Sequence, residues 1–309
     1  MCTTIAIAGQ QFCFGRNMDI AEDFGQQVLL VPERAPLPLR QETALDTHYA
    51  ILGMARLQDG FPLFADAMNE HGLCMAGLNF PQFAHYPDGN SWKPYSIAPF
   101  EMIPWVLGQC RTLAEAKQLL AHTELAAIPF SGTMPLTPLH WHIADASGSL
   151  AAEPLMGGLQ LTDNPAGVLT NSPPLSYQLA YLGQFRHLSP EENERKWCVP
   201  ACSKGLGNLG LPGDASSMSR FVRAAILREQ ADFRHDDVIR QCFHLLDAVS
   251  VIRGTIRLPE GGEYCTRYRC CMEPQGMRYH YRKYADNACR TVQAAPSQMQ
   301  GREILLLTA

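Results

Sequence analysis

Apolar and polar residues alternate along the first part of the chain in a way that predicts β-strands. Residues 3–8 are rich in β-branched side chains, and Ile5 and Ile7 fall on one face of a strand. Gly9 begins a turn, after which residues 12–18 form the returning strand of a hairpin. Four more strands are predicted before residue 81, at 27–32, 50–55, 63–68 and 73–80.

The apolar spacing then becomes helical. A helix is predicted over 96–110, and Thr112 is a suitable N-cap for a second helix that continues to residue 120. Two further helices are predicted after residues that can cap them, Ser216 or Ser217 for the first and Asp236 for the second.

Strand patterns return in the middle and at the end of the chain. They include a predicted hairpin of residues 159–162 and 167–170, and strands at 139–145, 150–153, 264–272, 276–284 and 303–308. Strands, helices and strands in this order fit two sheets between helical layers. No linker-like stretch divides the chain, which predicts one domain over residues 1–309.

Composition narrows the class of protein. The net charge of −5 provides no basic footprint for nucleic acid. No apolar run reaches the ~18–20 residues that span a bilayer, and the N-terminus lacks the regions of a signal peptide. Eleven cysteines are an odd number without the density of a disulfide scaffold, which fits a reducing compartment. We therefore expect a cytoplasmic protein without nucleic-acid or membrane partners.

Cys2 is the main candidate for chemistry. It follows the initiator Met1, and its small side chain permits removal of that residue. Removal would leave a thiol beside a free α-amine, a pairing that activates a nucleophile. A free α-amine titrates near ~7.7–8.0 and an ordinary thiol near ~8.5. From position alone, a small buried hydrophobe near a frayed end is the better explanation of Cys2.

The predicted N-terminal hairpin brings two charged residues close to Cys2. Arg16 would stabilise a thiolate, and Asp19 could accept a hydrogen bond from a terminal ammonium. Taken singly, Arg16 also fits a surface or salt-bridged arginine, and Asp19 also fits a turn cap.

These segments resemble a known family. The start Met1-Cys2-Thr3 and the run Phe14-Gly15-Arg16-Asn17-Met18-Asp19 are similar to the choloylglycine hydrolases, the N-terminal-nucleophile amidases that comprise bile salt hydrolases and penicillin V acylases. Further segments resemble the family in order, at 66–73, 77–81, 137–141, 169–173, 210–214 and 219–223. The resemblance implies an α+β fold, a four-layer αββα sandwich with two antiparallel sheets between helical layers, and often a homotetramer.

The resemblance also implies roles for individual residues. Cys2 is the nucleophile, Arg16 and Arg220 shape the electrostatics of its thiol, and Asp19 assists. The oxyanion donors are the backbone N–H of Asn79 and the side chain of Asn171. The full catalytic set is Cys2, Arg16, Asp19, Asn79, Asn171 and Arg220. This chemistry needs no metal and no organic cofactor.

The expected substrate has an apolar acyl group, so the thiol should adjoin an apolar pocket. The candidate lining residues are Met18, Ile20, Phe24, Phe61, Ile128, Phe130 and Leu136, although core packing would explain any one of them. Asn79 and residues 173–178 resemble the bile salt branch, because the acylase branch tends to carry an aromatic residue at the position of Asn79. Hydrolysis of the amide between a bile acid and glycine or taurine is therefore expected. Penicillin V acylase, another N-acyl amidase and a silent bile acid carrier remain alternatives.

Two further patterns are better explained without cofactors. Residues 205–210 match G-x-G-x-x-G, but they lack the strand–helix context of a dinucleotide site, so we predict a Gly-rich loop that leads to Arg220. His140 and His142 would share one strand face, yet no third ligand lies at a convincing spacing. Packing or hydrogen bonding is expected for both.

The clustered cysteines also suggest no metal site. Cys198 and Cys202 lie four residues apart, and Cys265, Cys270 and Cys271 form a second group. These spacings fit no standard structural zinc site. We expect core or surface thiols.

Overall fold

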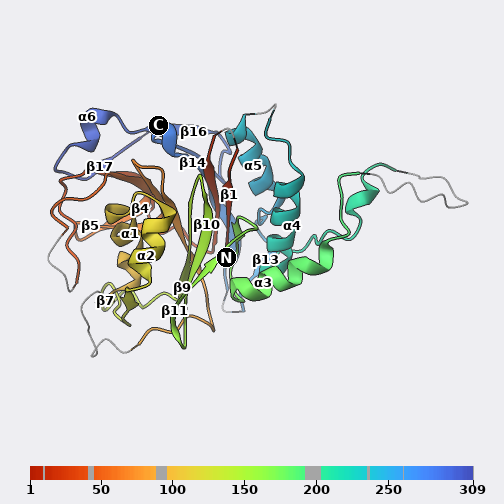
Figure 1. Ribbon diagram of the computed structural model, residues 1–309, viewed down its shortest axis with the longest axis horizontal. Helices are drawn as coiled ribbons and strands as arrows, with labels where there is room; N and C mark the ends of the chain where they lie inside the picture. The colour runs from red at the N-terminus through yellow and green to blue at the C-terminus, as the bar shows by residue number, and fades with distance from the viewer. Residues whose placement is uncertain are drawn as a thin grey trace, which may run out of the picture.

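Two large sheets lie face to face between two layers of helices (Figure 1). The computed structural model describes residues 1–9, 11–40, 45–87, 96–191, 203–234, 237–259 and 261–308. Helices α1 (Met102–Gln109) and α2 (Leu113–Leu120) lie on one outer side, and α3 (Leu175–Leu182), α4 (Ser217–Gln230) and α5 (Val238–Ala248) lie on the other (Figure 1). The predicted α+β, four-layer αββα sandwich is confirmed.

One sheet carries the N-terminus. Its strands follow the order β12-β1-β2-β14-β15-β16, and β13 pairs with β14; all these pairs are antiparallel. The bounds are β1 Cys2–Ile7, β2 Cys13–Ile20, β12 Val168–Leu169, β13 Ile256–Arg257, β14 Glu263–Glu273, β15 Arg278–Lys283 and β16 Arg290–Gln293.

The other sheet has the order β11-β10-β9-β6-β5-β4-β3-β17. Its strands are β3 Gln27–Val31, β4 Ile51–Gln58, β5 Phe61–Asn69, β6 Cys74–Asn79, β9 Leu139–Asp145, β10 Gly148–Leu155, β11 Gly158–Asp163 and β17 Leu305–Leu306. A small parallel pair joins β7 (Ser96–Ile97) to β8 (Glu124–Leu125). The short helices are η1 Pro99–Glu101, η2 Gly183–Phe185, η3 Leu206–Asn208, η4 Pro274–Gly276 and α6 Pro296–Met299.

Strand β1 is buried on both faces because it lies between the second sheet and α4. Its alternating side chains therefore have different neighbours. Thr4 Oγ1 lies 2.8 Å from His142 Nδ1 of the facing sheet, whereas Thr3 Oγ1 accepts a hydrogen bond from Arg220 of α4. Cys2 is two residues from Thr4 and so faces the space between the sheets.

The predicted hairpin of residues 159–162 and 167–170 is wrong. β11 pairs with β10 in the eight-stranded sheet, whereas β12 pairs with β1 in the other sheet. The chain crosses between the sheets at residues 164–167, where Asn164 Nδ2 donates to Val168 O at 2.9 Å and Gly167 adopts a φ of 62°. This crossing brings the segment after β12 to the N-terminal strand.

The predicted helix over 96–110 is also partly wrong. Residues 96–97 form β7, η1 follows, and α1 begins only at Met102. Pro99 supplies the first position of η1 because it needs no backbone donor there. Among the described residues, no helix combines the length and the apolar character that crossing a bilayer requires.

The predicted N-caps agree in the two cases that the described residues cover. Thr112 accepts from Glu115 N to cap α2, and Ser216 accepts from Ser219 N to cap α4. For α5 the cap is Asp237, which accepts from Ile239 N at 2.9 Å. The expected cap Asp236 lies outside the described residues.

Candidate active site

The β1–β2 hairpin places the Cys2 thiol beside a buried guanidinium. Cys2 pairs with Met18, and Thr4 pairs with Arg16, so Cys2 and Arg16 share the face between the sheets. Arg16 Nη2 lies 3.3 Å from Cys2 Sγ and donates to Gly77 O at 2.7 Å. Both residues are almost fully buried, which strengthens the attraction between the cation and a thiolate.

Asn171 and Arg220 hold the backbone of the same residue. Cys2 N donates to Asn171 Oδ1 at 2.8 Å, and Arg220 Nη2 donates to that same oxygen at 2.8 Å. Arg220 Nη1 donates to Cys2 O at 2.5 Å and to Thr3 Oγ1 at 2.6 Å. Arg220 is thus a clamp on the main chain of Cys2, whereas Arg16 contacts its sulfur.

The backbone of Asn79 faces the side chain of Asn171. Phe80 N donates to Pro138 O across β6 and β9, so the neighbouring pair of Asn79 and Leu139 is a non-hydrogen-bonded pair. The N–H and C=O groups of Asn79 therefore point away from β9. Asn79 O accepts from Asn171 Nδ2 at 2.7 Å, which confirms this direction for the carbonyl group.

Asp19 lies behind the thiol, on the side of β2 that faces the helices. Its Oδ1 accepts from Thr266 Oγ1 at 2.6 Å, and its Oδ2 lies 3.9 Å from Arg220 Nη1. Oδ2 is buried and makes no hydrogen bond with the described residues. Burial raises the pKa of the Asp19 carboxyl, against the lowering effect of Arg220 and Thr266. Met1 N donates to the backbone oxygen of Asp19, and burial lowers the pKa of that amine.

A cavity of about 450 Å³ opens beside the thiol. Cys2, Arg16, Gly77 and Asn79 line it, and most of the remaining wall is apolar. Six of the seven predicted lining residues are in the wall, namely Met18, Ile20, Phe24, Ile128, Phe130 and Leu136.

Phe61 does not line this cavity. Its side chain is only 4% exposed and packs behind the wall, with its ring 5.5 Å from Phe100 and 6.1 Å from Phe130. It supports the lining rather than forming it, because β5 directs it into the core under α1.

The sequence patterns did not identify several residues of the site. Thr3 Oγ1 accepts a hydrogen bond from Arg220, and Asp66 Oδ2 of β5 forms an ion pair with Arg16 Nη1 at 3.3 Å. Asp66 begins the segment 66–73, and a carboxylate inside an apolar strand is a signal that could have found it. Arg56 and Tyr264 add polar groups to the cavity wall. The missed apolar wall residues include Leu63, Phe64, Phe100, Ile103 and Met134.

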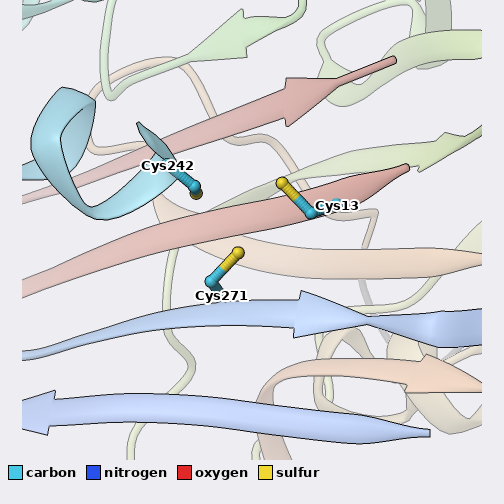
Figure 2. A group of neighbouring side chains, drawn as sticks. All are labelled: Cys13, Cys242 and Cys271. Atoms are coloured by element: carbon cyan, nitrogen blue, oxygen red, sulfur yellow. The ribbon is translucent and has the colours of Figure 1, made fainter. Parts of the chain in front are cut away.

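Three thiols converge away from the cavity. The sulfur atoms of Cys13, Cys242 and Cys271 lie within 4.8 Å of one another and point toward a common centre (Figure 2). Thiolates suit soft metal ions, but in the described part of the chain no His, Asp or Glu joins the group. All three residues are fully buried, so thiol contacts in the core explain them.

The other predicted cysteine and histidine features are structural where they are described. Cys265 and Cys270 are buried, and Cys198 and Cys202 lie outside the described residues. His140 lies within hydrogen-bond distance of Glu153 and Thr170, and His142 of Thr4 and Asn164. Residues 205–210 contain only the single turn η3 and no strand–helix unit. Hydrogen bonding of both histidines is confirmed.

Comparison with known proteins gives one consistent result. The family model for linear amide C–N hydrolases, choloylglycine hydrolase family, matches residues 2–306. The chain is 39% identical over 312 residues to a bile salt hydrolase/transferase of Lactiplantibacillus plantarum, covering 99% of this chain and 96% of that protein. It is 32% identical over 296 residues to a conjugated bile acid hydrolase of Lactobacillus acidophilus, covering 93% of both.

Solved structures agree with the sequence matches. A variant of conjugated bile acid hydrolase from Clostridium perfringens superposes with a TM-score of 0.90 at 33% identity, covering 98% of this chain and 96% of that one. Penicillin V acylase from Agrobacterium tumefaciens shares the fold, with a TM-score of 0.77 at 21% identity, covering 98% and 90%. The chain belongs to the choloylglycine hydrolase family of linear amide C–N hydrolases.

Proposed function

We propose that this chain hydrolyses the amide bond between a bile acid and glycine or taurine, with Cys2 as nucleophile after removal of Met1. One observation carries the proposal. Cys2, Arg16 and Asn79 meet at the wall of one mostly apolar cavity, and Asn171 donates to the carbonyl oxygen of Asn79. The curated relatives named as bile salt and conjugated bile acid hydrolases support the choice of substrate.

The first step is acyl transfer to sulfur. The Cys2 thiolate attacks the amide carbonyl carbon, and a C–S bond forms as the carbonyl oxygen takes up negative charge. Arg16 Nη2 at 3.3 Å stabilises the thiolate before attack. The C–N bond then breaks, and glycine or taurine leaves with a proton. Water cleaves the thioester, which releases the bile acid and restores the thiol.

The proton carrier is the α-amine of Cys2. With Met1 removed, this nitrogen keeps Asn171 Oδ1 as an acceptor at 2.8 Å. It takes the thiol proton, directly or through water, and later delivers it to the leaving amine. Against the lowering effect of burial, the charge of Asp19 raises the pKa of the Met1 amine in the structure, and we assign the same task toward the new Cys2 ammonium to this carboxylate.

Two donors serve the oxyanion. Asn171 Nδ2 uses one hydrogen for Asn79 O and has a second hydrogen to donate. The Asn79 N–H points away from β9, on the side of β6 from which Asn171 approaches. Donors that are fixed before the reaction stabilise the tetrahedral intermediate without reorganisation.

The cavity suits an amphipathic anion. Its apolar wall can accept a steroid, and its volume of about 450 Å³ is within the usual range for ligand sites. Arg56 also lines it and makes no hydrogen bond or ion pair within the described part of the chain. We assign Arg56 to the carboxylate or sulfonate of the substrate's head group.

Release of free amine from glycocholate, taurocholate and penicillin V, measured side by side under reducing conditions, tests the assignment. Faster release of glycine or taurine supports it and gives the head-group preference. Faster release of the penicillin nucleus would indicate a penicillin V acylase that uses the same nucleophile. Absence of release from all three, with loss of Met1 confirmed by intact mass, contradicts the bile salt assignment and points to another amide substrate or to a silent carrier.

Replacement of the nucleophile is the matched control. Cys2→Ser should fold as the parent does and lose nearly all turnover, because a hydroxyl is a much weaker nucleophile at neutral pH. Wild-type turnover in this variant would exclude Cys2 as the nucleophile.

We also propose a single domain, a homotetramer and a cytoplasmic location. The described cysteines are all free, which is consistent with a reducing compartment. The described parts of the connection between α3 and α4 extend outward from the helical layer (Figure 1). That connection exposes Leu206 and Leu209, which a partner chain could cover.

A further inference from the structure

We propose that Asp66 is a positioning residue, whose carboxylate holds the Arg16 guanidinium against the Cys2 sulfur. The proposal rests on the proposed thiol chemistry and adds to it a residue that does not line the cavity. Asp66 belongs to β5 of the eight-stranded sheet, yet all its side-chain partners come from the other sheet.

The carboxylate of Asp66 contacts four hydrogen-bond donors. Asp66 Oδ2 accepts from Tyr268 OH at 2.6 Å and lies 3.3 Å from Arg16 Nη1. Asp66 Oδ1 accepts from Tyr279 OH at 2.5 Å and from the Cys270 thiol at 3.4 Å. A fully buried carboxylate is costly unless it is paired and hydrogen-bonded, and here both oxygens are saturated.

The two tyrosines remain donors. Burial, and then the negative charge of Asp66, raise the pKa of Tyr268 and of Tyr279 well above its usual value. Both phenols therefore stay protonated and keep pointing their hydrogens at the carboxylate. This arrangement fixes the direction in which Asp66 presents Oδ2 to Arg16.

The orientation of Arg16 depends on few contacts. Nη2 contacts Cys2 Sγ, Met18 Sδ and Gly77 O, and Nη1 contacts Ala65 O and Asp66. Arg16 Nε is buried without a hydrogen bond to the described residues. Asp66 is thus the anion that anchors one end of the guanidinium fork while the other end meets the thiol.

A simpler interpretation is that Asp66 only joins the two sheets and acts on the thiol only as a nearby negative charge. The two interpretations predict opposite changes in how easily the Cys2 thiolate forms when Asp66 is removed. If Asp66 were merely a nearby negative charge, its removal would make the Cys2 thiolate easier to form. If it positions Arg16, its removal lets the guanidinium leave the sulfur, and the thiolate becomes harder to form.

The experiment measures Cys2 alkylation by iodoacetamide against pH, followed by mass spectrometry of the N-terminal peptide in Met1-free protein. In Asp66→Ala the midpoint should move to higher pH, and kcat should fall by about a hundredfold with little change in KM. Asp66→Asn keeps an oxygen for Arg16, so both quantities should recover toward wild type.

Thermal denaturation confirms that each variant is folded, and Tyr279→Phe is the matched control. It removes a donor from the oxygen that does not contact Arg16, so it should lower stability while moving the midpoint much less than Asp66→Ala. A midpoint in Asp66→Ala that stays in place or moves to lower pH overturns the proposal. Equal behaviour of the Ala and Asn variants overturns it as well. Alkylation needs no substrate, so these outcomes are independent of the bile salt assignment.

Discussion

At the scale of residues, the two buried arginines of the site have different tasks. Arg16 contacts the Cys2 sulfur, whereas Arg220 contacts the Cys2 carbonyl oxygen and Asn171 Oδ1. Arg220 therefore fixes the backbone from which the thiol projects and the Asn171 amide, which we propose as an oxyanion donor. A lysine could not replace either one, because each uses several donors of the planar fork.

Asn171 offers a prediction that separates its two groups. Asn171→Asp keeps an oxygen for Cys2 N and Arg220 but removes the amide donor. We expect kcat to fall by about 10²–10³-fold, because an oxyanion donor is lost, with a much smaller change in KM. Steady-state kinetics on the better bile salt measures this.

Asn171→Ala is the companion variant, since it removes donor and acceptor together. It should be at least as inactive as Asn171→Asp and less stable, because two buried donors lose their acceptor. Near-normal kcat in Asn171→Asp would show that the amide does not serve the oxyanion.

Arg56 offers a prediction about binding. Arg56→Leu should raise KM for the bile salt by about tenfold, the effect of losing one charge-assisted contact, and should change kcat less. A substrate with a neutral glycinamide head group should be cleaved with the same KM by variant and wild type. Equal losses on the charged and neutral substrates would contradict the assigned contact.

How much of the site the sequence reveals depends on chain distance. Cys2, Arg16 and Asp19 belong to one hairpin, so its pairing was enough to place Arg16 and Asp19 close to Cys2, on opposite faces of β2. Asn171 and Arg220 reach Cys2 across 169 and 218 positions of the chain. No local pattern specifies such contacts, so they were expected only from the resemblance to a family.

At the scale of elements, the crossing from β11 to β12 shows what alternation cannot predict. Both strands carry ordinary strand patterns, and a turn signal separates them, so a hairpin was the natural expectation. The choice between two sheets depends on tertiary partners, here Asn164 and the edge of β1. The active site depends on this choice, because β12 leads directly to Asn171.

His142 connects β9 to β1 and predicts how stability depends on pH. Burial, then Arg228 and His140, lower the pKa of His142 from 6.5 to about 3. As the pH falls through 6.5, His142 becomes protonated in the unfolded chain but stays neutral in the folded chain. The stability present above pH 6.5 is therefore lost progressively toward about pH 3.

The measurement is the free energy of unfolding from urea titrations in wild type and His142→Gln. Between about pH 7 and pH 5, wild type should lose about 2 kcal/mol more than the variant. The exposed His122, changed to Gln, is the control and should leave the wild-type dependence intact. Identical pH dependence in His142→Gln would mean that the buried imidazole is not the titrating group.

At the scale of the whole molecule, the layers were predictable because the strands and helices of each layer have their own hydrophobic periodicity in the sequence. Strand, helix and strand regions alternate over long stretches, and the periodicities of two and 3.6 residues are distinct. The order of strands within the sheets was not predictable. β14 comes from the end of the chain yet pairs with β2, and β15 lies on the far side of β14. Tyr268 and Tyr279 approach Asp66 only in consequence.

The proposed assembly gives a prediction for the intact particle. Leu209 is 74% exposed on the connection between α3 and α4, so it contributes little to the folded monomer. In light scattering, the wild type should have the mass of four 34.3 kDa chains, and Leu209→Asp should have a smaller mass at the same melting temperature.

Met156 is 87% exposed at the turn between β10 and β11, so Met156→Asp is the matched control and should keep the wild-type mass. An unchanged mass in Leu209→Asp would show that this connection does not join the chains. A wild-type mass of one chain would exclude the tetramer itself.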